Sequence, residues 1–205
     1  MHSSTTTNIS YSFQLPRLVL IFITGILPIS SVALHALGWV PIRWMIIPNI
    51  IMMSVCCFHL FNSAQLYNLI RNGWISGLVA VLLYDLSRIP FIYAGWEDFI
   101  PGLGGWLSGT QENFTIGYLW RYFGNGAGLG LGFAILHYVF RFRKLISVGL
   151  FYGIAVFLIL DVVLLLSENA QEMMFELTPL TITGSLVGHA TYGLVLGIVM
   201  KKLQK

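Results

Sequence analysis

The stretch that decides the fold class runs from Leu145 to Leu166 and reads LISVGLFYGIAVFLILDVVLLL. Asp161 is its single charged residue. A helix that crosses a lipid bilayer needs about 20 predominantly apolar residues, and this stretch supplies them without a break. We therefore expect it to form a transmembrane helix.

The rest of the chain has the same character. Of its 205 residues, 57% are hydrophobic and only 9% are charged, whereas about 25% are charged in an average soluble domain. Eleven basic and eight acidic residues cannot cover the surface of a soluble fold of this size. The composition excludes a soluble enzyme, a nucleic-acid-binding module and a disordered chain. It predicts an all-α polytopic integral membrane protein whose main partner is the lipid bilayer.

Several further windows are long and apolar enough to cross a bilayer. Pro48 and Asn49 interrupt the second window, so five spans are the alternative to six. The six windows are Leu18–Gly38, Ile42–Phe61, Ile70–Ala94, Ile116–Phe140, Leu145–Leu166 and Leu177–Met200. They divide the chain into a polar N-terminal segment (1–17), a transmembrane hairpin (18–61), a four-helix bundle (70–200) and a basic tail (201–205).

The charges outside these windows separate by sign. The link after the fourth window carries Arg141, Arg143 and Lys144, and the C-terminal tail carries three lysines, in both cases without an acid. The loops after the third and fifth windows each hold three acids and no base. Because an excess of lysine and arginine marks cytoplasmic loops, we expect both termini in the cytoplasm and the acidic loops outside.

Two of the windows share a pattern of glycine and aspartate. The third contains GLVAVLLYD (77–85) and the fifth contains GIAVFLILD (153–161). In the windows that follow them, Gly124 and Gly128 match Gly184 and Gly188 at a constant spacing of 60 positions. Both units start and end on the same side of the membrane. The third and fourth windows are therefore predicted to form a parallel internal repeat with the fifth and sixth.

Glycines also recur at every fourth position in the fourth and sixth windows, and so lie along one face of each helix. Such a stripe lets two helix backbones approach closely, which favours helix association in lipid. A ligand that contacts the bare backbone is the alternative use of such a face. The predicted packing glycines are Gly124, Gly128, Gly132, Gly184, Gly188, Gly193 and Gly197.

Four charged residues lie well inside the windows, away from their ends: Asp85, Arg88, Arg121 and Asp161. A charge at the bilayer centre costs about 2.5–3.5 kcal/mol, so we expect the two acids and two bases to face one another in the outer half of the membrane. They either form ion pairs that hold the bundle together, or line a site that includes His189 and binds a small polar solute or relays protons.

Two further histidines, His59 and His137, lie near the inner ends of the second and fourth windows. Histidines from two helices are able to ligate a haem within a bundle. No ligand spacing supports a metal site, and a lone histidine on an apolar helix is more often hydrogen-bonded within the core. We therefore expect no cofactor, with a haem between these residues as an alternative.

Three classes of function stay open. The first is a small transporter-like or solute-binding bundle that uses the Asp/Arg cluster. The second is an accessory or structural subunit that packs against its own copies or a larger membrane complex. The third is a membrane-embedded haem or lipid enzyme that uses the histidines. The chain has no Walker loop and no metalloprotease His-Glu pair, so no motif of soluble-type catalysis is present.

Three short motifs carry a resemblance to other proteins: Tyr84-Asp85-Leu-Ser-Arg88, Trp120-Arg-Tyr-Phe-Gly-Asn-Gly126 and Gly188-His189-Ala-Thr-Tyr192-Gly193-x3-Gly197. The chain resembles a loose group of small bacterial multi-pass membrane proteins with a Tyr-Asp-x2-Arg helix and a closing His-x2-Tyr-Gly-x3-Gly helix. The likeness covers residues 70–200 and implies four packed helices in a bacterial cytoplasmic membrane. Those proteins have a histidine ahead of the Asn-Gly pair, where this chain has Arg121-Tyr-Phe-Gly124.

Overall fold

The computed structural model describes residues 15–60 and 64–204, and the secondary structure in these ranges is helical. Most of the predicted polar segment 1–17 lies outside them, and its last three residues, Leu15 to Arg17, begin the first helix. In chain order the elements are α1 (Leu15–Ala36), α2 (Ile42–Leu60), α3 (Ala64–Tyr93), α4 (Ile100–Ser108), α5 (Phe114–Leu119), the π-helix η1 (Trp120–Gly126), α6 (Ala127–Phe140), α7 (Leu145–Leu166), α8 (Glu168–Met173) and α9 (Pro179–Leu203).

Five segments of the described chain are long and apolar enough to cross a membrane. These are Leu15–Ala36, Leu66–Tyr93, Phe114–Phe140, Leu145–Leu166 and Pro179–Leu203. The second predicted window forms the helix α2, but its apolar stretch, Ile42–Phe58, is shorter than the other five. The all-α prediction is confirmed, and five of its six predicted spans appear as long apolar helices.

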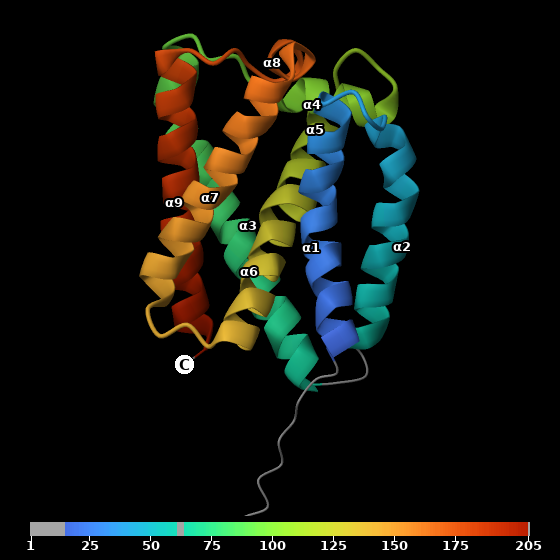
Figure 1. Ribbon diagram of the computed structural model, residues 1–205, viewed down its shortest axis with the longest axis vertical. Coiled ribbons are helices and arrows are strands. Elements are labelled where there is room, and N and C mark those ends of the chain that lie inside the picture. The colour runs from blue at the N-terminus through green and yellow to red at the C-terminus, as the bar shows by residue number, and fades with distance from the viewer. Residues whose placement is uncertain (1–14, 61–63, 205) are drawn as a thin grey trace, which may run out of the picture.

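The long helices lie side by side as an antiparallel bundle (Figure 1). The described N-terminal end, at Leu15, lies at the same end of the bundle as the C-terminus. The basic link after α6 lies at this end, whereas α4 and α8 cover the opposite end. The structure thus separates the basic link from the acidic loops by the length of the bundle.

The order of packing decides where space is left between helices. α9 packs against α7 and α3, and α6 packs against α3 and α1, whereas α1 and α7 make few contacts with each other. The bundle is therefore tightly packed around α3 and more open between α1 and α7.

Glycines make the closest helix contacts. Gly77 of α3 meets the backbone of Gly126 and Gly130, and Gly153 of α7 meets the backbone of His189 and Gly193 in the same manner. A Cβ atom at either glycine would collide with the facing backbone, so only glycine permits these approaches.

Each of the seven glycines selected from the sequence lies against another segment. The neighbours are Pro28 for Gly124, Gly25 for Gly128, Tyr152 for Gly132, Trp96 for Gly184, Tyr84 for Gly188, Gly149 for Gly193 and Leu145 for Gly197. Gly130 contacts Gly77 as Gly193 contacts Gly153, so Gly130 and Gly193 occupy matching places. They are 63 positions apart rather than the 60 expected from sequence.

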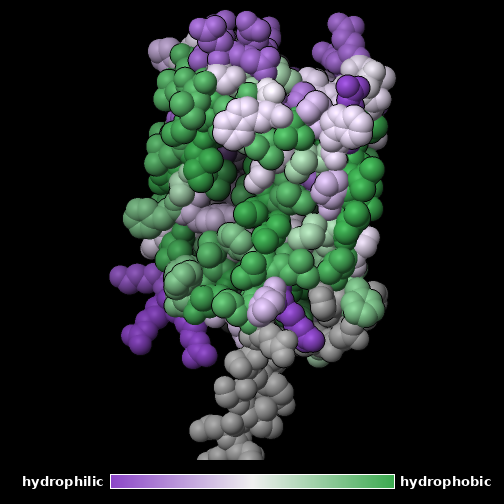
Figure 2. Space-filling model, turned by 45° about the vertical axis from the view of Figure 1, so that its right-hand side comes forward, coloured by the Kyte–Doolittle hydropathy of each residue, from purple (hydrophilic) through white to green (hydrophobic). Residues whose placement is uncertain are grey.

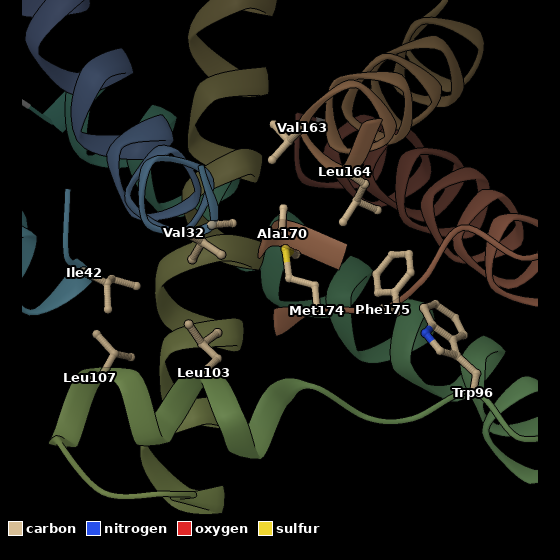
Figure 3. Close-up of a cluster of buried hydrophobic side chains, with 11 residues drawn as sticks. Val32, Ile42, Trp96, Leu103, Leu107, Val163, Leu164, Ala170, Met174 and Phe175 are labelled. Atoms are coloured by element: carbon tan, nitrogen blue, oxygen red, sulfur yellow. The ribbon is translucent and has the colours of Figure 1, made fainter. Parts of the chain in front are cut away.

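A hydrophobic cluster closes the acidic end of the bundle. Figure 3 shows its side chains gathered between α1, α4, α7 and α8. Val32 comes from α1, Leu103 from α4, and Met174 and Phe175 from the segment after α8. This cluster fixes the two short helices across the bundle.

Candidate functional site

Two arginines and two aspartates form the charged centre of the structure. Arg121 of η1 donates from Nε and Nη2 to Asp85 Oδ1 of α3, at 2.8 and 2.5 Å. Arg88, one turn after Asp85, donates from Nη2 to Asp98 Oδ1 at 2.7 Å, and its Nη1 lies 3.8 Å from Asp85 Oδ1. We call these four residues the charge cluster. Its formal charge is zero.

Both arginines of the charge cluster are buried. Arg88 is 2% exposed and Arg121 is 8% exposed. Each guanidinium lies over an aromatic ring, Arg88 at 4.9 Å from the centroid of Trp96 and Arg121 at 4.5 Å from that of Tyr84. A carboxylate on one side and a ring on the other replace the water that each base loses, which lowers the cost of burying it.

Asp98 is held in its ionised form by its surroundings. Burial raises the pKa of Asp98, but hydrogen bonds from Tyr118 and Arg88, together with the charge of Arg88, outweigh burial and leave the pKa below its ordinary value. The Tyr118 hydroxyl donates to Asp98 Oδ2 at 2.6 Å, and the backbone N–H of Ile100 donates to Asp98 Oδ1 at 3.2 Å. The carboxylate thus ties α3, the start of α4 and α5 together.

The charge cluster differs from the expected set in one member. We expected Asp161 to face the two arginines together with Asp85, but Arg121 pairs with Asp85, and Asp98 is the second acid. Within the described residues Asp161 of α7 forms no ion pair, and its Oδ1 is buried without a hydrogen-bond partner. Sequence reasoning placed Asp98 only in an acidic loop, because its pairing depends on how that loop folds back over α3.

The π-helix η1 shapes the neighbourhood of Arg121. In this element the backbone opens from the i→i+4 to the i→i+5 pattern, and such bulges occur frequently at functional sites. Arg121 and Asn125 are both buried in η1, and they are four positions apart, so they project from the same side. The Tyr192 hydroxyl donates to the Gly126 carbonyl at 2.7 Å and anchors the end of η1 to α9.

A cavity of about 350 Å³ adjoins Arg121. It lies among α1, α6 and α7, and the space-filling view shows a hollow in the apolar surface below the polar end of the molecule (Figure 2). Most of its wall is aliphatic or aromatic, and Met174 and Phe175 close it toward the acidic end. Its polar lining residues are Ser30, Tyr84, Arg121, Asn125, Tyr152 and His189.

Several polar atoms around this cavity have no internal partner. Within the described chain, the hydrogen bonds of Arg121 use Nε and Nη2 and leave Nη1 free. Asn125 is 7% exposed, and its Oδ1 is buried without a hydrogen bond. Buried polar atoms are normally satisfied by protein or by water, so Asn125 Oδ1 is free to accept a hydrogen bond from a water molecule or a ligand.

His189 also contributes to the polar wall. Its Nδ1 lies 2.9 Å from the Ser185 carbonyl, and its ring meets that of Tyr84 at a centroid distance of 5.0 Å. Tyr84 therefore contacts both His189 and Arg121. The structure brings four of the five predicted binding residues, Asp85, Arg88, Arg121 and His189, into one neighbourhood.

Of the two histidines considered for a haem, the structure describes the side chain of one, His137. His137 Nε2 lies 3.1 Å from Gln204 Oε1, and its ring stacks on Phe142. The side chain of His59 lies outside the described residues. Among the side chains that the structure describes, no group of three histidine, cysteine or acidic residues gathers as a metal site would require.

Comparison of the chain with protein-family models, with curated proteins and with solved structures gives no match.

Proposed function

We propose that this chain is a multi-pass protein of a bacterial cytoplasmic membrane that binds a lipid-soluble, amphipathic small molecule in the cavity beside Arg121. The cavity carries this proposal, because it combines an aliphatic wall with a few converging polar groups at one end. Ligand sites in proteins have this composition and a volume of about 300–1,000 Å³.

The exposed surface supports the membrane assignment. Large hydrophobic side chains cover the outside of the bundle, among them Ile50 at 60% exposure and Leu158 at 55%. With 19 residues, α2 is about 28 Å long, close to the hydrocarbon thickness of a bilayer. We therefore propose six crossing segments, with the basic end of the bundle in the cytoplasm.

The glycine contacts support the proposed internal repeat. Gly77 packs on Gly130 as Gly153 packs on Gly193. The pair α3 and α6 then corresponds to the pair α7 and α9, and α1 packs on α6 much as α3 packs on α9. In this repeat α9 packs on α7 and α3, whereas its counterpart α6 packs on α3 and α1. No helix of the repeat therefore fills the space between α1 and α7.

The open side of the bundle, between α1 and α7, gives the ligand a route from the membrane into the cavity. The cavity is lined by Ile26 and Ile29 of α1 and by Val156, Ile159 and Leu160 of α7, two helices that make few contacts with each other. A molecule dissolved in the outer half of the bilayer would reach the cavity between these helices without crossing water. The solute-binding bundle expected from the sequence thus becomes a binder of membrane-dissolved molecules.

The test fills the cavity with a large side chain and measures how much bound small molecule the purified protein retains. Val156→Trp places a large ring in the cavity wall, whereas Leu158→Trp on the same helix faces outward and serves as the matched control. Native mass spectrometry of the purified proteins should show a bound lipid-soluble molecule on wild type and L158W and its loss from V156W. Equal occupancy in V156W, or none in wild type, would overturn the proposed function.

A further inference from the structure

The head group that the cavity accepts can be deduced from the polar atoms left free along its wall. Arg121 has one free nitrogen, Nη1, which can only donate a hydrogen bond. The ring of Tyr84 contacts both Arg121 and His189, and both residues line the cavity.

The hydrogen bond of His189 fixes its tautomer. A backbone carbonyl can only accept, so Nδ1 must carry the proton that it donates to Ser185. In a neutral imidazole the other nitrogen, Nε2, is then an acceptor. No hydrogen bond to Nε2 occurs among the described residues. Beside the unpaired Asn125 Oδ1, the polar wall therefore offers a donor from Arg121 and a further acceptor from His189.

The charge balance restricts the ligand further. Arg121 is neutralised by Asp85, and Arg88 by Asp98, so the wall is already neutral before anything binds. An ionised head group would bring a net charge into a site with an aliphatic wall, where an unpaired charge is costly. An uncharged head group avoids that cost.

We propose, on the basis of the ligand-binding function proposed above, that the cavity selects a neutral amphiphile whose head carries a hydroxyl group. A hydroxyl oxygen accepts the hydrogen bond of Arg121 Nη1, and its proton is donated to His189 Nε2. The apolar chain of the ligand lies along the walls formed by α1 and α7. A long-chain alcohol is the simplest molecule with this chemistry.

Four probes of one chain length separate the possibilities: 1-dodecanol, dodecyl methyl ether, dodecanoate and dodecylammonium. Each is added at pH 7 to protein in nanodiscs, and bound molecules are counted by native mass spectrometry. Dodecanol should bind at one per chain, with the two ions at least tenfold weaker because of their charge. The ether should also be at least tenfold weaker, because it has no proton to donate.

His189→Phe provides the site-specific control. Since phenylalanine cannot accept a hydrogen bond, H189F should bind dodecanol and the ether equally, with dodecanol reduced at least tenfold from wild type. Tightest binding of dodecanoate or dodecylammonium, or equal binding of alcohol and ether by wild type, would overturn the head-group inference while leaving the cavity function intact. If no probe binds wild type, the proposed function itself fails.

Discussion

Arg121 joins η1 to α3 by placing two hydrogen bonds on a single oxygen of Asp85, at 2.8 Å from Nε and 2.5 Å from Nη2. The second oxygen, Oδ2, is buried without a partner. The pair both ties two helices together and holds the guanidinium beside the cavity. Its loss should therefore affect stability and ligand binding together.

Asp85→Asn should leave the buried charge of Arg121 without a counter-ion. Removing one partner of a buried ion pair costs about 3–5 kcal/mol. We expect that loss in the free energy of unfolding, measured by titration with SDS in mixed micelles. Asp161→Asn is the matched control, because Asp161 lies in a helix interior but forms no ion pair in the described structure. A D85N protein as stable as D161N would contradict the assigned pairing.

The depressed pKa of Asp98 predicts an acid-dependent stability. A carboxylate whose folded pKa is lowered stabilises the fold above its unfolded pKa of about 3.9, and that contribution is lost as the pH falls through the folded pKa. The difference in melting temperature between wild type and Asp98→Asn should be constant from pH 7 to pH 5 and shrink below about pH 4. A difference that already shrinks between pH 7 and pH 5 would show that Asp98 is not held ionised.

Gly193→Ala should separate α7 from α9. The new Cβ would meet the backbone of Gly149, which cannot move aside as a side chain could. Overpacking of this kind costs about 1–3 kcal/mol, and the same SDS titration measures it. Gly102→Ala in α4 is the control, since open space surrounds that position and its stability should be unchanged or slightly higher. Equal stability of the two variants would contradict the close contact.

The proposed orientation predicts which loops are reached from outside the cell. In a chain whose Cys56 and Cys57 are replaced by alanine, Glu172→Cys should react with a membrane-impermeant maleimide in intact cells. Arg143→Cys, at the basic end, should react only after permeabilisation. Both positions are exposed, so access to the protein surface does not distinguish them. The reverse pattern would invert the orientation.

Hydropathy was sufficient to predict the long helices, because a span is a property of about 20 consecutive residues. The stretch from Leu145 to Leu166 begins and ends as expected. The helices α4 and α8 were not predicted, because both are short. They are held in place by Leu103 of α4 and by Met174 after α8, which pack into a hydrophobic cluster with residues distant in sequence. Local sequence carries no sign of that cluster.

The charge cluster was predicted from the sequence only in part. Asp85 and Arg88 were correctly placed on one face, since three residues separate them on a helix. The second acid of the cluster is Asp98 and not Asp161, and its pairing with Arg88 depends on the fold of the loop after α3, which a helix pattern does not contain. A site near Arg121 and His189 was expected, but its aliphatic wall was not, since that wall depends on how α1 and α7 pack.

The most direct test of the central claim asks where a bound amphiphile lies. A long-chain alcohol with a photoreactive diazirine near its chain end is added to the protein in nanodiscs, irradiated, and mapped by peptide mass spectrometry. We predict labelling of α1 and α7 at the cavity wall, around Ile29 and Leu160, that excess unlabelled dodecanol abolishes. Labelling spread over outward-facing residues such as Ile50 of α2, and unaffected by dodecanol, would contradict a binding cavity.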